Sequence, residues 1–172
     1  YASKHHVMFL LFAKLGLRVS TVRAIDIDDV QRNEEDGTYI RLRNRPESET
    51  PLKNGDESNR VVSIDTEFEE ALIDYINKLD RKEDEYGRVP LFPGRSGRVA
   101  ISTLRNYVYG WTRPCKINKG CPHADRDPGT CEAAQSYNNA SKCPSSKSCH
   151  PVRKGYITSA LRKGIPMGVV TG

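Results

Sequence analysis

Cysteine is absent from the first 114 residues of this 172-residue chain, and all five cysteines fall between Cys115 and Cys149. An odd and local set of this kind argues against the disulfide scaffold of a small secreted protein. Long apolar runs are lacking too, since the most apolar stretch, Val7 to Ala13, is far shorter than the roughly 20 residues that span a bilayer. No small-residue cleavage site follows that stretch, which favours a buried helix over a signal peptide. We therefore expect a cytoplasmic protein with no membrane partner.

The charge balance is modest. Lys and Arg number 27 against 22 Asp and Glu, which gives a net charge of +5. This excess is compatible with a polyanionic partner but does not require one. The length allows one domain with its own core, or one domain with a sizeable insertion. The first residue is Tyr and not Met, so we expect that more chain precedes it in the intact protein.

Apolar periodicity predicts a mainly α fold with a small antiparallel β-sheet, an α+β class. We expect helices over 5–15, 66–82, 102–111 and 150–163, a short helix over 20–24, and strands over 38–43 and 61–64. Ser20 and Thr66 are suitable capping residues, and Gly16 and Gly164 are suitable helix ends. The polar segment between the strands predicts a hairpin with a long tip. Residues 112–148 are rich in Cys, Pro, Asn and Ser, which indicates an irregular insertion.

The segment CHPVRKGYITSAL, which begins at Cys149, places His150 and Arg153 three residues apart at the start of a predicted helix. Residues with this spacing share a helix face, so both side chains can reach one target. A guanidinium fork beside a titratable imidazole suits an anionic centre such as a phosphate. Taken alone the pair is weak evidence, because a polar helix start gives the same pattern.

Two further segments strengthen this interpretation. GLRVSTVRAIDIDDV (16–30) and the hairpin TYIRLRNRPESETPLKNGDESNRVVSI (38–64) precede the His-x-x-Arg segment. In this order the three segments resemble the catalytic domain of the tyrosine recombinases, the phage-integrase family, and the Cys-rich insertion resembles a subset of archaeal integrases. The resemblance implies that residues 1–172 are a partial catalytic domain of that fold, incomplete at its C-terminus, with an insertion at about 112–148.

The resemblance assigns a role to four residues. Arg18 and Arg153 match the two arginines that clamp the phosphate, Lys53 the lysine of the hairpin, and His150 the position before the second arginine. Physical chemistry agrees, because guanidiniums stabilise the charge that develops on a phosphate under attack. A lysine can protonate the leaving 5′-oxygen, and a histidine titrates near neutral pH. Less favoured alternatives to Lys53 are Lys4, Lys14 and Arg60. The structural alternative for Arg18 is that it binds helix C-terminal carbonyls.

The chain also departs from the family pattern. Thr21 stands where a carboxylate commonly orients the first arginine. The nucleophilic tyrosine of the family follows the second arginine by about thirty or more residues, after a further His or Trp. The sequence ends before both positions, and we expect Tyr107, Tyr109 and Tyr156 to pack in the core. We therefore expect no DNA cleavage by this chain alone.

For the intact protein the resemblance implies site-specific recombination through a phosphotyrosyl intermediate, by a homotetramer on double-stranded DNA. This chemistry requires no cofactor. The alternative is a non-catalytic DNA-binding protein with a zinc-stabilised insertion. Cys115, Cys121, Cys131 and Cys143, with His123 close by, are of the ligand types that hold a tetrahedral structural zinc. Reduced thiols in a flexible loop, or one incidental disulfide, are the other possibilities.

Overall fold

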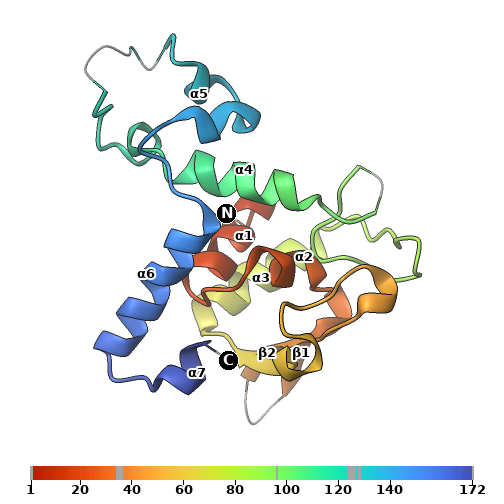
Figure 1. Cartoon of the computed structure of the whole chain (residues 1–172). Helices are drawn as coiled ribbons and strands as arrows, with labels where there is room; N and C mark the ends of the chain where they lie inside the picture. The colour runs from red at the N-terminus through yellow and green to blue at the C-terminus, as the bar shows by residue number, and fades with distance from the viewer. Residues whose placement is uncertain (1, 34–36, 96, 124–126, 128, 172) are drawn as a thin grey trace.

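The structure, a computed structural model, describes residues 2–33, 37–95, 97–123, 127 and 129–171 (Figure 1). It is mainly α-helical with one three-stranded antiparallel sheet, which confirms the predicted fold class. The helices are α1 (Lys4–Ala13), α2 (Val19–Ala24), α3 (Thr66–Asn77), α4 (Ile101–Trp111), α5 (Glu132–Gln135), α6 (Cys149–Arg162) and α7 (Met167–Thr171). The strands are β1 (Val30–Asn33), β2 (Gly37–Leu42) and β3 (Arg60–Ser63). Among the described residues, no helix combines the length and the apolar character that crossing a membrane requires.

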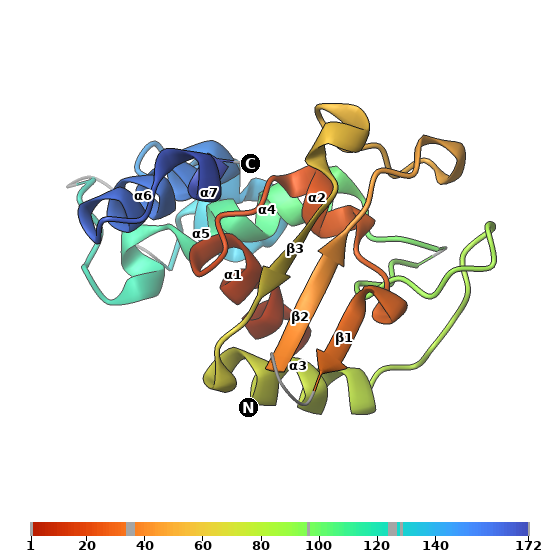
Figure 2. The same ribbon diagram turned by 90° about the horizontal axis from the view of Figure 1, so that it is seen from below.

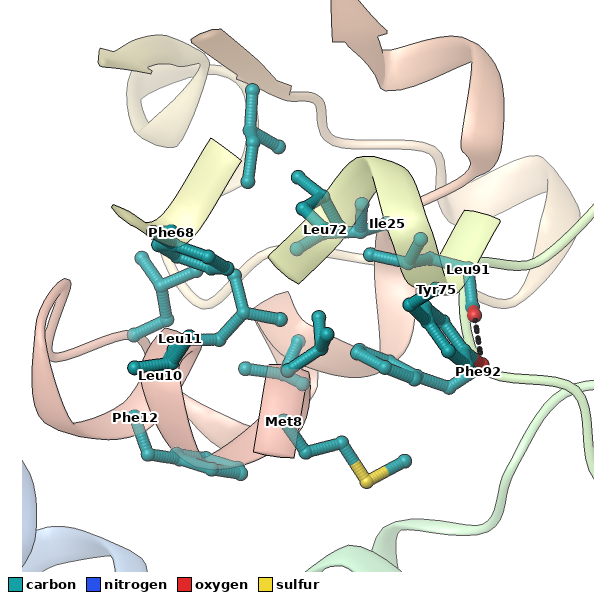
Figure 3. Packing of buried hydrophobic residues seen from close by; sticks show 14 of the residues in the cluster. Met8, Leu10, Leu11, Phe12, Ile25, Phe68, Leu72, Tyr75, Leu91 and Phe92 are labelled. Carbon is teal, nitrogen blue, oxygen red and sulfur yellow. Dashed lines mark hydrogen bonds between the residues drawn. The ribbon is translucent and has the colours of Figure 1, made fainter. Parts of the chain in front are cut away.

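The core forms around α1, which packs against α2, α3 and α6. Helix α1 is apolar on most sides, and four of its residues are at most 2% exposed: Val7, Met8, Leu11 and Phe12. Helix α3 faces it with Phe68 and Leu72 (Figure 3). Burial of each such side chain contributes roughly 1.5–3 kcal/mol, so this contact holds the helical layer together.

The sheet has the order β1-β2-β3, with Ile40 paired to Val30 on one side and to Val62 on the other. Figure 2 shows β3 on the side of the sheet that lies nearer α1 and α6. The pairing of β2 with β3 confirms the predicted hairpin. Strand β1 was not predicted, because its sequence, VQRN, is short and polar and half of it is exposed at the sheet edge. The long tip folds into two short 3-10 turns, over Pro46–Ser48 and Gly55–Ser58.

The helix ends position the residues discussed below. Helix α1 gives way to Gly16 at φ +57°, a left-handed conformation that favours glycine. Arg18, and not Ser20, is the residue before α2. Asp65, and not Thr66, caps α3, since its side chain accepts a hydrogen bond from the Phe68 N–H at 2.9 Å. Helix α3 ends at Asn77, five residues earlier than predicted.

The insertion is more ordered than its composition suggested. It contains α5 and a 3-10 helix over Tyr137–Lys142, and the latter packs against α4. The ring of Tyr137 lies where a side chain on Gly110 would collide with it, and it meets Tyr107 edge-on at a centroid distance of 4.9 Å. The buried Arg113 side chain donates to the carbonyls of Gly110 and Ala133. The described part of the insertion is thus docked on α4 through side chains of its own.

Candidate functional site

A cleft of about 740 Å³ opens where α2 and α6 begin, beside α4 and the tip of the hairpin. Its lining includes all four residues predicted from the sequence as catalytic, together with one further arginine: Arg18, Lys53, Arg105, His150 and Arg153. These residues come from segments far apart in the chain, and folding brings them to one place. The cleft is therefore lined on several sides by cationic or titratable donors.

Arg153 is the most buried of these residues, with 7% of its surface exposed. It lies in the first turns of α6, and its guanidinium donates to the carbonyl oxygen of Gly16. Burial lowers the pKa of Arg153, and the positive charges of Arg18 and Arg60 lower it further. No carboxylate among the described residues forms an ion pair with Arg153. A buried cation in this situation favours an external anion.

Arg18 is half-buried at the start of α2. Among the described residues, none forms a hydrogen bond or an ion pair with its guanidinium. The alternative that Arg18 binds helix C-terminal carbonyls is therefore not observed, since the Gly16 carbonyl accepts from Arg153 instead. The positive charge of Arg18 lowers the pKa of both Arg60 and Arg153.

Arg60 opens β3 beside these two residues. Its Nη1 donates to the Ser58 carbonyl at 3.3 Å. Burial lowers the pKa of Arg60, and the neighbouring charge of Arg18 lowers it further. We refer to Arg18, Arg60 and Arg153 as the open cluster. In the described part of the chain it contains three guanidiniums and no paired carboxylate, so it has the electrostatic character of an anion site.

Lys53 and His150 are exposed on the cleft. The alternative lysines are engaged elsewhere: Lys4 donates to the Pro93 carbonyl at 2.5 Å, and Lys14 pairs with Asp65 at 2.9 Å. Lys53 is therefore the lysine that the fold places beside the open cluster. An ammonium and an imidazole with free access to solvent can each donate a proton to a bound oxyanion.

The tyrosines differ in their surroundings. Tyr107 packs against the core, as predicted. Tyr109 lines the cleft instead. Tyr156 lies against Gly16, close enough that a side chain on Gly16 would collide with its ring, and it interacts electrostatically with Arg60 and Arg153. Core packing thus does not account for Tyr109 or Tyr156.

The predicted zinc ligands are free thiols, of which Cys143 is buried and Cys115, Cys121 and Cys131 are partly exposed. Within the described ranges, no three His, Cys, Asp or Glu side chains are grouped so that they could hold a metal ion. The Nε2 atom of His123 is buried with no hydrogen-bond partner there. The zinc site stays a prediction.

Arg105 was not among the predicted site residues, and Arg60 was named only as a less favoured alternative to Lys53. Arg105 stands in no motif, because it reaches the site only through the tertiary packing of α4. The one sequence signal was the basic residue at the start of the return strand, which is Arg60.

No family model and no curated protein sequence matches this chain. Among solved structures, it is similar to the crystal structure of XerA recombinase, with a TM-score of 0.58 and 18% sequence identity. The match covers 96% of this chain and 46% of that one, so the chain spans about half the length of this structural neighbour. At this identity the likeness establishes the fold alone. The chain has a tyrosine recombinase-like fold.

Proposed function

We propose that this chain is part of a tyrosine recombinase, and that its cleft binds the phosphate at which a strand of double-stranded DNA is cut and rejoined. One observation carries the proposal: Arg18, Lys53, His150 and Arg153 line one cleft, and among the described residues no carboxylate pairs with its arginines. The likeness in fold to XerA recombinase supports it.

In this proposal the arginines stabilise the transition state. Attack on a phosphodiester places additional negative charge on the non-bridging oxygens, and guanidiniums fixed in advance offset that charge without reorganising. Arg153 is suited to this role because its burial weakens the screening by water and its bond to the Gly16 carbonyl fixes its position. Arg18 approaches the same phosphate from the start of α2.

Lys53 is the proposed general acid. When the hydroxyl of a tyrosine attacks the phosphorus, its proton passes to His150, the bond to the 5′-oxygen breaks, and the leaving oxygen takes a proton from the Lys53 ammonium. The products are a 3′-phosphotyrosyl link and a free 5′-hydroxyl. In the second step a 5′-hydroxyl from the partner strand attacks and returns its proton to Lys53, and the released tyrosine oxygen takes its proton back from His150. His150 also hydrogen-bonds the phosphate.

The intact protein supplies the nucleophilic tyrosine in this proposal, and it acts in the cytoplasm as a homotetramer on paired DNA sites. Any zinc bound by the cysteines of the insertion would be structural, because four protein ligands leave no open coordination position. Metal analysis of protein prepared under reducing conditions tests that part separately. One zinc per chain, lost when Cys131 and Cys143 are replaced by Ser, is the expected result.

The main experiment traps the covalent intermediate. The intact protein is incubated with a nicked duplex whose cleavage releases a short strand, so that religation is prevented and a protein–DNA adduct accumulates. We expect the adduct with the native protein and a loss of at least 100-fold in its rate of formation with Arg18→Gln. Lys53→Ala should be rescued by a substrate with a 5′-thio leaving group, which needs no proton. DNA binding without any adduct would instead establish the non-catalytic alternative.

A further inference from the structure

The cleft is larger than a single phosphate needs. Its volume of about 740 Å³ falls in the ~300–1,000 Å³ range of sites that enclose whole small molecules. Arg18 and Arg153 of the open cluster account for only part of the lining. The remainder includes three residues with polar side chains that the proposed chemistry does not use: Arg105, Tyr109 and Ser148.

Arg105 is exposed on α4, and no carboxylate in the described ranges forms an ion pair with it. It shares the lining of the cleft with Cys149 of α6. Burial raises the pKa of the Cys149 thiol, and the positive charge of Arg105 opposes that rise. Cys149 directly precedes His150. Arg105 of α4 and Arg153 of α6 therefore line the same cleft from two different helices.

Two residues with hydroxyl groups, Ser148 and Tyr109, line the cleft together with Arg105. Ser148 is the residue before α6, yet its side chain makes no capping hydrogen bond to the helix. Tyr109 is one helical turn after Arg105 on α4, and its partly exposed side chain lines the cleft. An arginine beside two hydroxyl donors is a suitable set for the oxygens of a phosphate.

We propose that Arg105, with Ser148 and Tyr109, forms a second phosphate subsite, so that the cleft holds two neighbouring phosphates of the same strand. This inference rests on the proposed function and extends it. The open cluster binds the phosphate that reacts, and Arg105 binds its neighbour. Arg105 is thus a binding and positioning residue that fixes the register of the strand, and it does not touch the reacting phosphorus.

A nucleotide with two phosphates tests the second subsite without knowledge of the DNA target sequence. Thymidine 3′,5′-bisphosphate carries two neighbouring phosphates, and thymidine 3′-monophosphate and thymidine 5′-monophosphate carry one each. Binding of each to the purified chain is measured by calorimetry. We expect the bisphosphate to bind about tenfold more tightly than either monophosphate, as one additional charge-assisted contact provides.

Arg105→Gln should abolish that tenfold advantage and leave monophosphate binding within about twofold of the native value. The matched control is Arg81→Gln, which removes an equal charge from an exposed position outside the cleft and should leave the advantage intact. A bisphosphate advantage that survives in Arg105→Gln would overturn the inference. Failure of the proposed function is distinguishable, because Arg18→Gln would then leave the binding of all three nucleotides unchanged.

Discussion

Two groups of arginines are built into this fold, and they differ in what surrounds them. In the first group, each arginine is paired with buried carboxylates of Asp26, Asp29 or Asp84; its members are Arg43, Arg45, Arg88 and Arg98. We refer to this group as the neutralised cluster. The second is the open cluster of Arg18, Arg60 and Arg153, with no paired carboxylate among the described residues. The same side chain thus serves folding in one place and remains available to a ligand in the other.

The neutralised cluster ties distant segments together. Asp26, after α2, accepts from Arg88 Nε at 2.7 Å and pairs with Arg45 at 3.2 Å. Arg98 pairs with Asp26 as well and reaches Asp84 at 2.8 Å. The cluster so links the end of α2, the hairpin tip and the loop before α4. Because its arginines are paired with carboxylates of the protein itself, the neutralised cluster does not favour the binding of an external anion.

The largest effect should come from Asp26→Ala. This substitution leaves several buried guanidiniums without their shared carboxylate, and breaking a buried ion pair from one side costs about 3–5 kcal/mol. We expect the free energy of unfolding, measured by urea denaturation, to fall by that amount. The matched control is Asp28→Ala, at an exposed side chain, which should change it by less than about 0.5 kcal/mol. Equal losses in the two variants would remove the basis for treating Asp26 as a structural centre.

Exchanging one arginine in each cluster for methionine should lower the free energy of unfolding in the neutralised cluster and not in the open cluster. Arg98→Met leaves Asp26 and Asp84 underpaired, and we expect a loss of about 3 kcal/mol in stability. Arg60→Met relieves repulsion by Arg18 and Arg153, so stability should be unchanged or rise by up to about 1 kcal/mol. At the same time, binding of duplex DNA by Arg60→Met should weaken about tenfold, with a shallower salt dependence. Urea denaturation measures the stability of each variant, and fluorescence anisotropy measures its DNA binding. A loss of stability on Arg60→Met would contradict the assignment of the open cluster to ligand binding.

The sequence predicted some parts of this architecture and not others, for physical reasons. Helices α3 and α4 carry clear apolar periodicity, α1 is a short apolar run, and the paired strands β2 and β3 alternate clearly, so each is recognisable locally. Strand β1 does not, because its pairing with β2 decides its conformation more than its own residues do. Arg18, Lys53, His150 and Arg153 were identified by motif, and the fold brings them together in one cleft.

Which arginines remain unpaired could not be predicted. Arg88 and Arg60 are equally basic in sequence, and only tertiary packing supplies a carboxylate to the first and not to the second. The docking of the insertion was missed for the same reason. The contact between Tyr137 and Gly110 joins residues whose proximity no local pattern indicates.

Gly16 contributes both to the stability of the fold and to the position of Arg153 in the open cluster. Gly16→Ala should therefore have an intermediate effect on the free energy of unfolding. Alanine is strained at φ +57°, and its methyl group would collide with the Tyr156 ring. We expect a loss of about 2–3 kcal/mol in stability. Because the Gly16 carbonyl holds Arg153, phosphate binding should weaken as well.

The control for this variant is Gly164→Ala. Gly164 has φ +81° with open space around it, so it combines similar backbone strain with no collision. Its loss should be about 1 kcal/mol, with phosphate binding unchanged. Thermal unfolding with and without thymidine 3′-monophosphate separates the two variants. Equal losses and equal ligand effects would mean that the close packing at Gly16 is not needed for its carbonyl to position Arg153.

The smallest effect tests whether burial, and not pairing alone, gives the neutralised cluster its strength. Lys14 is also paired, with Asp65 and Glu67, but those carboxylates are 57% and 66% exposed. Asp65→Asn keeps an N-cap and removes the charge, so it should cost only a few tenths of a kcal/mol, whereas Asp65→Ala removes both and should cost about 1 kcal/mol.

The hydrogen bond from Lys14, and then that from the Phe68 N–H, lower the pKa of Asp65 below its ordinary 3.8. A lowered carboxyl pKa contributes stability above pH 3.8 that is lost as the pH falls through the folded value, so the difference between native and Asp65→Asn protein should vanish in acid. Urea denaturation from pH 7 to pH 3 measures this difference. A loss in the free energy of unfolding on Asp65→Asn as large as that on Asp26→Ala would show that solvent exposure does not distinguish the two paired sites.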